Sequence, residues 1–318
     1  MKTPILGASY VARSVNAADN RMVNLFPEIT PDGGKTNGYL MRAPGMKFIT
    51  TMVDDGPVRG LWTHTSQDVF YIVSGQYVYK MDAIDAAPVL IGTMSGTGTA
   101  PVSIDDNGAQ VFFAAGGKGY IYDTSASPSP TFTEITDPDF PGAGTVAFLD
   151  GYFAVNKPDS QQVYVSGLYD GFAWDALAFG SAEGSPDGVV TISSTHKELW
   201  VFGSKTTEVW YDAGTANFPL APIQGALIEV GCLAPHSVAK LDNTLFWLGT
   251  DPRGQGIVYR ANGYTPQRIS THAIEWQIQQ YGNISDAVAY TYQQEGHSFY
   301  VLNFPSINTT WVYDVATQ

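Results

Sequence analysis

Gly33–Thr36 reads GGKT, and it is the first segment whose residue types could do chemistry. A glycine-rich turn followed by lysine and threonine can bind phosphates. That motif needs a further glycine at position 29, where this chain has Ile29. The sequence pattern also gives no strand–loop–helix context for such a loop. We therefore expect no nucleotide site here.

Histidine, cysteine and carboxylate side chains are the usual metal ligands, but their spacing here fits neither a zinc nor a calcium motif. The histidines show no HxxxH or HExxH spacing, and the aspartate pairs lack the alternating ligands and glycine of a calcium loop. No GxSxG nucleophile turn occurs. We expect no catalytic residue, no metal site and no cofactor, and interpret the aspartates as solvated loop tips. The residues concerned are His64, His196, His236, His272, His297, Asp54-Asp55, Asp105-Asp106, Asp137 and Asp139.

A phrase of three short strands recurs six times and indicates what holds the chain together. The first strand carries a recurring valine, the second an aromatic residue, and the third an apolar-Tyr pair. The valine column keeps a step of 44 to 50 residues and the other two columns follow it, so chance is a poor explanation. The columns are Val58, Val102, Val146, Val190, Val238 and Val288; Phe70, Phe112, Phe153, Trp200, Phe246 and Phe299; and Tyr79, Tyr122, Tyr164, Tyr211, Tyr259 and Tyr313.

This period, with several strands per unit, is typical of a β-propeller blade. We predict an all-β fold: a six-bladed β-propeller over residues 46–318, with an extended N-terminal arm over 1–45. Outer strands are expected at 88–94, 131–137, 172–180, 218–224 and 265–271, but none follows Tyr313. The similar segment 46–52 is therefore expected to close the last blade. An open solenoid of the same units, or a seventh blade lost beyond Gln318, remains open.

Charge is distributed unevenly along the chain. Residues 1–50 hold six basic residues and three acids, whereas the remaining residues hold 10 basic and 27 acidic. This acidic body argues against tight nucleic-acid binding. Cys232, the only cysteine, excludes an internal disulfide, and we interpret it as a buried structural thiol. The sequence shows no signal peptide and no apolar run long enough for a membrane span, so we expect assembly in a reducing compartment.

Two stretches resemble a known family. One is SYVARSVNAADNRMVNLFPE with YLMRAPGMKF, at 9–28 and 39–48. The other is GSPDGVVTISSTHKELWVFGSKTTEVWYDAG with IEVGCLAPHSVAKLDNTLFWLG, at 184–214 and 228–249. Both look like the packaged-DNA stabilisation protein, or tail hub (nozzle) protein, of short-tailed phages. Members of that family usually continue beyond the point where this chain ends.

The resemblance implies a structural virion protein of the tail, assembled in the host cytoplasm and not an enzyme. It implies a hub that attaches below the head-to-tail adaptor, closes the DNA channel and anchors distal tail parts. Its partners would be copies of itself in a ring, with six-fold symmetry expected, the adaptor, and spike, fibre or needle proteins. DNA would pass without tight binding, and this chain would not insert into a membrane. We expect partner contacts in the arm at Tyr10, Arg13, Arg21, Asn24, Phe26 and Pro27.

Three alternatives stay open. A carbohydrate-binding or glycoside-hydrolysing propeller would need acids or aromatics converging at one mouth of its channel. A scaffold propeller for host peptides would show an exposed apolar patch on one face. The segment 1–40 could also be an unattached terminus, although its apolar Met22, Val23, Leu25 and Phe26 favour an arm that lies on a neighbour.

Overall fold

A computed structural model describes residues 10–11, 19–30, 37–53, 56–65, 68–250 and 256–317. The chain divides into two compact units. One is Phe48–Cys232, and the other joins Met1–Lys47 with Leu233–Gln318. Gly33–Thr36 and Asp54-Asp55 lie outside the described residues.

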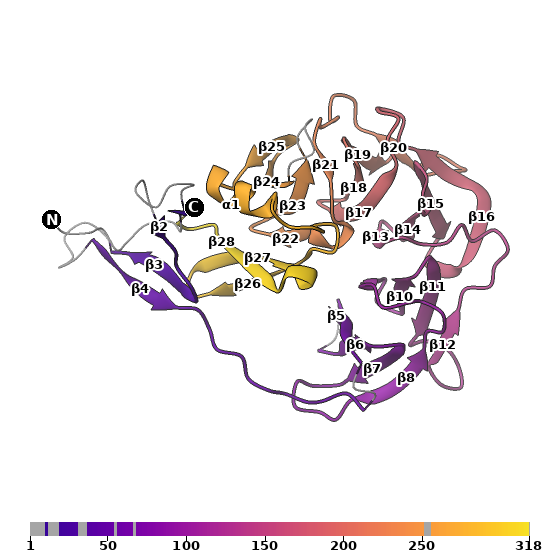
Figure 1. Ribbon diagram of the computed structural model, residues 1–318. Helices are drawn as coiled ribbons and strands as arrows, with labels where there is room; N and C mark the ends of the chain where they lie inside the picture. The colour runs from indigo at the N-terminus through magenta and orange to yellow at the C-terminus, as the bar shows by residue number, and fades with distance from the viewer. Residues whose placement is uncertain are drawn as a thin grey trace. The chain divides into compact units, whose positions relative to one another are not determined.

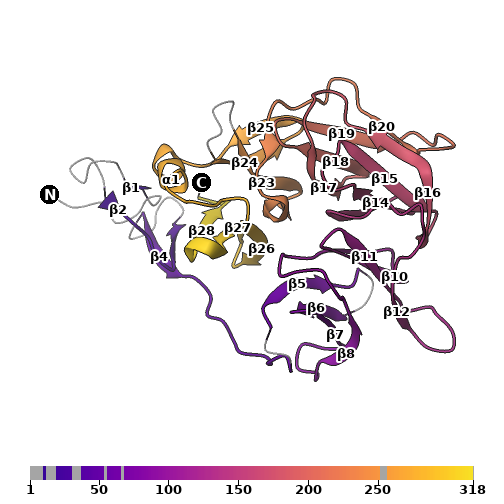
Figure 2. The same cartoon turned by 45° about the vertical axis from the view of Figure 1, so that its right-hand side comes forward.

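The unit Phe48–Cys232 contains four antiparallel four-stranded sheets, each made from consecutive strands (Figures 1 and 2). The predicted outer strands at 88–94, 131–137, 172–180 and 218–224 are confirmed as the last strand of each sheet. A short strand, β21 (Gly231–Cys232), ends the unit. The blades are β5 (Val58–Thr63), β6 (Phe70–Ser74), β7 (Tyr77–Met81) and β8 (Val89–Thr93); β9 (Ser103–Asp106), β10 (Gln110–Ala115), β11 (Lys118–Asp123) and β12 (Thr131–Glu134); β13 (Val146–Leu149), β14 (Tyr152–Asn156), β15 (Gln162–Gly167) and β16 (Asp170–Ser181); and β17 (Val189–Thr195), β18 (Glu198–Gly203), β19 (Thr207–Asp212) and β20 (Leu220–Pro222).

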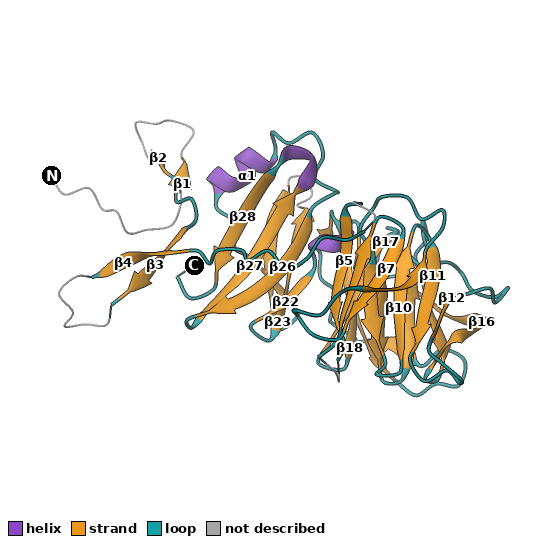
Figure 3. Ribbon diagram, turned by 90° about the horizontal axis from the view of Figure 1, so that it is seen from below, coloured by secondary structure: helices purple, strands orange, loops and turns teal. Residues whose placement is uncertain are grey.

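The other unit contains two further blade sheets, one short α-helix and two small hairpins (Figure 3). The helix has seven residues, and no helix in the described part of the chain is long and apolar enough to cross a membrane. The elements are β1 (Tyr10–Val11) with β2 (Asp19–Asn20); β3 (Leu25–Ile29) with β4 (Gly38–Arg42); β22 (Ala239–Leu241), β23 (Thr244–Thr250), β24 (Gly256–Asn262) and β25 (Thr265–Arg268); α1 (His272–Ile278); β26 (Val288–Gln294), β27 (His297–Phe304) and β28 (Thr309–Asp314); and the 3₁₀ turns Pro235–Ser237 and Pro305–Ile307.

The predicted closing strand is wrong. Residues 46–52 form no strand, and the last sheet has the three strands β26, β27 and β28. The segment leaves Met46 fully exposed and Phe48 three-quarters exposed, so its apolar residues do not line one buried face. Met52 instead packs against the first blade, beside Ile72.

The blades hold together because their inner strands are apolar on both faces. Phe112 and Phe113 are neighbours on β10, and both are fully buried. Phe113 belongs to the core shared with the first blade, and Phe112 to the core shared with the third. Successive residues of a strand point to opposite faces, so the second blade must be covered on both sides.

The repeated aromatic column is core, as its spacing predicted. Five of its six members are buried in the second strands of their blades, and Phe70 is half-buried. The tyrosine column is less uniform, because Tyr211 is 44% exposed. Cys232 is buried, as expected of a structural thiol.

Replacing Phe112 by alanine should lower the free energy of unfolding by about 3–5 kcal/mol, because a fully buried ring leaves a cavity. In the structure this ring contacts Phe140, Phe153 and Trp174. Urea unfolding measures the change. Tyr211→Ala, at the 44% exposed position, is the matched control and should cost much less. A loss below about 1 kcal/mol for Phe112→Ala would reject this column as core.

Candidate functional site

The β3–β4 hairpin is the best-defined part of the predicted arm. Its strands pair in antiparallel register, with Phe26 opposite Met41 and Glu28 opposite Tyr39. Asn24 adopts a left-handed conformation (φ 53°) where the chain enters β3, and the Ala43 amide donates to the Asn24 carbonyl at 2.9 Å. A lone two-stranded hairpin is marginally stable in water, so packing must hold this one in place.

Phe26 provides that packing. Its side chain is 5% exposed, although it comes from a peripheral hairpin. The ring lies 4.8 Å from the His297 ring and 5.2 Å from the Phe299 ring, in tilted and edge-on geometries that favour aromatic pairs. His297 and Phe299 lie on β27, in the same compact unit. The hairpin is therefore anchored on the last blade through one face.

His297 links the hairpin and the blade electrostatically. Its Nε2 lies 2.7 Å from Glu28 Oε2 on β3, and its Nδ1 lies 2.7 Å from Asp314 Oδ2 on β28. Burial of the ring lowers the pKa of His297, but the hydrogen bonds to Glu28 and Asp314 outweigh it, so the net pKa is raised. The protonated imidazole can donate from both nitrogens, which suits two carboxylates.

Of the six residues predicted to contact partners, the structure describes the side chains of four, and three of these lie at or next to β3. Arg13 and the side chain of Tyr10 lie outside the described residues, although the backbone of Tyr10 forms β1. Arg21 and Asn24 are exposed, and Pro27 is half-buried. The partner-contact assignments remain predictions.

Glu28, His297 and Asp314 were missed by the sequence reasoning. Glu28 and His297 lie 269 residues apart, and no local pattern pairs them. The NLFPE motif itself was the available signal, because it places a carboxylate two residues after a buried aromatic.

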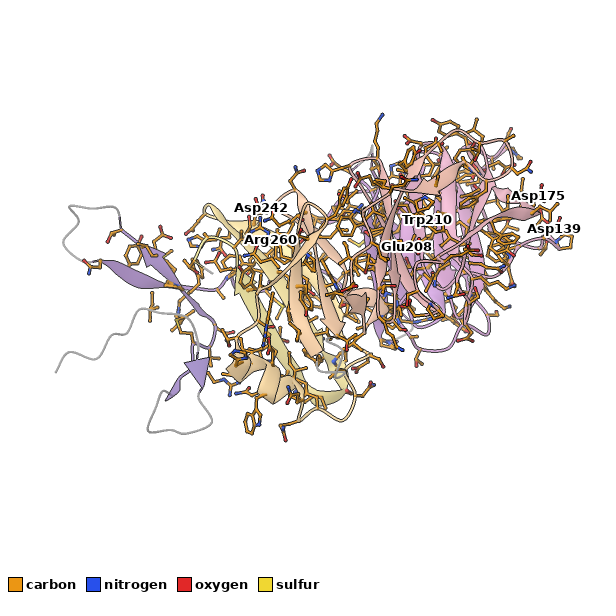
Figure 4. The ribbon with its side chains drawn as sticks, turned by 90° about the horizontal axis from the view of Figure 1, so that it is seen from above. Asp139, Asp175, Glu208, Trp210, Asp242 and Arg260 are labelled. Carbon is orange, nitrogen blue, oxygen red and sulfur yellow. The ribbon has the colours of Figure 1, made fainter. Side chains whose placement is uncertain are left out.

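Buried carboxylates elsewhere accept hydrogen bonds from indole groups, and Figure 4 labels one such pair, Glu208 and Trp210. Trp62 Nε1 donates to Asp106 at 2.7 Å, and Trp210 Nε1 donates to Glu208 at 2.7 Å. Asp106 is 3% exposed and lies on β9, so interpreting Asp105-Asp106 as a solvated loop tip was wrong. Asp106 accepts from Trp62 of the first blade, and the half-buried Asp105 accepts from the Phe148 amide of the third blade.

Other acids lie at the surface. Asp139 and Asp175, both exposed, point away from their unit, and Asp242 forms an ion pair with Arg260 at 2.9 Å (Figure 4). In the described parts of the chain, no three His, Cys, Asp or Glu side chains group as metal ligands would. The β3–β4 hairpin, anchored on the last blade, is therefore the candidate functional site.

Comparison with known families gives this hairpin and its blades a context. The family described as bacteriophage P22 Gp10, beta-propeller, matches residues 1–318. The chain belongs to this family. The predicted six-bladed propeller and the predicted resemblance are thereby confirmed.

A relative within the Gp10 family is the tail hub protein gp10 of Salmonella phage P22. It is 24% identical over 293 residues, which cover 89% of this chain and 60% of that protein. The chain thus spans less than two thirds of the relative that it matches.

Solved structures support the fold of this Gp10-family chain. The β-propeller domain of Cps50 (Swd1) from Myceliophteria thermophila matches with a TM-score of 0.53 and 10% identity, over 81% of this chain and 83% of that one. An extracellular domain from B. thetaiotaomicron, described as part of a hybrid two component system, has a TM-score of 0.54 and 11% identity, over 85% and 33% of the two chains. These likenesses concern the fold alone.

Raising the pH should loosen the hairpin. Packing of the hairpin on the last blade favours protonated His297, because the pKa of His297 in the folded protein lies above the ordinary value of about 6.5. The stabilisation is complete below about pH 6.5 and is lost as the pH rises through the raised pKa. Hydrogen exchange of the Leu25–Ile29 amides, corrected for its intrinsic pH dependence, should therefore increase relative to β10 as the pH rises above about 6.5.

His297→Gln is the control, because glutamine is polar but does not titrate in this range. Its hairpin amides should show no pH-dependent step. Identical pH profiles for the two proteins would exclude His297 as the titrating group.

Proposed function

We propose that this protein is a structural component of a phage tail and acts there as a hub. The observation that carries the proposal is the Gp10-family match across residues 1–318. The name of the P22 relative, a tail hub protein, supports the same role and the predicted location in the virion tail. Within each unit the blades share apolar cores with their neighbours, which suits a structural part.

In this proposal, copies of the chain form a ring below the head-to-tail adaptor, close the DNA channel and anchor spike, fibre or needle proteins. Residues 1–45 act as an arm that contacts partners, and 46–318 form the propeller. The hairpin supports a partner-contacting role for the arm, because Ile29 remains 66% exposed while Phe26 and Glu28 hold β3 on the last blade.

We also propose that the hub works without catalysis. Glycoside hydrolysis needs two carboxyl groups free to exchange protons with the substrate. The buried Asp106, Asp187 and Glu208 instead accept hydrogen bonds from backbone, hydroxyl or indole groups. The lone pairs of these carboxylates are therefore used in hydrogen bonds that stabilise the fold.

Removing residues 1–40 should leave a folded propeller that assembles poorly. All repeated phrases lie beyond residue 55, so the cores between blades are kept, although the truncation uncovers Phe299 and removes the Glu28 partner of His297. Native mass spectrometry of the full-length and truncated proteins, alone and with an adaptor, would show the change in assembly. Loss of the cooperative thermal transition in the truncated protein would place the arm in the folding core instead.

The protein should not bind duplex DNA tightly. Beyond residue 50 it carries 10 basic and 27 acidic residues, whereas tight binding needs Lys and Arg to displace counterions from phosphates. Titration of labelled duplex at low and physiological salt measures this. Saturable binding tighter than about 1 μM at physiological salt, with a steep salt dependence, would contradict the prediction.

A further inference from the structure

One face of the β3–β4 hairpin packs on the last blade, and the other points away from it. Phe26 and Glu28 point to the last blade, where they contact His297. Because side chains alternate along a strand, Leu25, Pro27 and Ile29 point the other way. The register places Arg42, Leu40 and Gly38 opposite these three residues, on the same outward face.

This outward face is apolar where a solvated face should be polar. A hairpin with one face packed on a protein normally alternates polar residues toward water. Here Ile29 is 66% exposed and Leu25 is 38% exposed, and Val23, just before the strand, is 60% exposed. The outward face carries no acid, and its one charge is Arg42. Covering such an apolar surface with another protein lowers the free energy of the system.

Charge indicates which protein that is. The hairpin is flanked by the exposed cations Arg21 and Lys47 in addition to Arg42. The chain beyond residue 50 has 17 more acidic than basic residues, so each copy offers an acidic body that complements this segment. Hairpin and body are different surfaces, and a contact between different surfaces of identical chains is head-to-tail and can close into a ring.

We propose that the outward face of the β3–β4 hairpin, formed by Leu25, Pro27, Ile29, Leu40 and Arg42, docks on the acidic body of a second copy of this chain. The inference rests on the proposed hub function and names the contact through which its ring is built. The contacts of Phe26 and Glu28 with the last blade fix the hairpin, so docking does not have to order a free segment.

Ile29→Glu tests the face directly. It places a charge in the apolar contact and should raise the concentration needed for half-assembly by about tenfold or more. Met46→Glu introduces the same charge at a fully exposed position that belongs neither to the docking face nor to the body beyond residue 50, and should alter assembly far less. Analytical ultracentrifugation measures assembly, and thermal unfolding verifies that each variant is folded.

The outcomes separate this inference from the hub proposal. If the wild type forms a ring and Ile29→Glu assembles as well as Met46→Glu, the docking face is wrong and the hub proposal stands. A wild type that stays monomeric at every concentration, alone and with an adaptor, counts against both.

A cross-linking experiment identifies the occupant. Cys232 is 1% exposed, so Ile29→Cys creates an accessible thiol that can carry a photoreactive maleimide. Equal amounts of ¹⁴N- and ¹⁵N-labelled protein are assembled together and irradiated. We expect cross-linked peptides that join light and heavy chains. Cross-links confined to one isotope, or none in an assembled ring, overturn the proposal.

Discussion

Burial on both faces of each blade is the constraint on which the rest of the structure depends. Val201 and Trp200 are successive residues of β18, 1% and 4% exposed, so neither face of that sheet can be left to water. The same holds for Phe112 and Phe113 in the second blade. A blade of this kind is not stable alone, and its cores are shared with neighbours rather than enclosed within it. Repetition of the unit follows directly from this requirement.

The last blade shows how the constraint reaches the arm. Tyr300 and Leu302 face the preceding blade and share its core. Phe299 lies on the opposite face of β27, where a blade would otherwise expose an aromatic side chain. The Phe26 ring packs against Phe299, and the Glu28 carboxylate forms a hydrogen bond with the buried His297. These contacts hold the β3–β4 hairpin on the last blade, and they leave the outward face of the hairpin exposed.

The repeated blades could be predicted because residues of the same type recur at similar intervals along the sequence. Aromatic residues such as Phe153 and Phe246 recur at a fixed step, and both are fully buried. The predicted strand at 46–52 failed because an apolar-rich segment, MKFITTM, is a local property, whereas strand formation needs a partner edge. The contact between His297 and Glu28 could not be foreseen, because it depends on where the three-dimensional fold brings two distant residues.

Polar side chains on the inner strands hydrogen-bond the edge of the next blade. The amides of Phe148 and Ile192 donate to Asp105 Oδ2 at 2.8 Å and to Thr145 Oγ1 at 3.1 Å, and each acceptor belongs to the preceding blade. An inner strand is an edge, and its free N–H groups would be costly if buried and adhesive if exposed. Side chains of one blade satisfy the edge of the next, so an acid such as Asp105 is occupied by the architecture that would have to position it for catalysis. In the proposed ring, acids that remain at the surface, such as Asp139 and Asp175, contribute a negative field that favours contact with the cationic hairpin segment. The same excess of carboxylates thus serves both blade cohesion and partner choice.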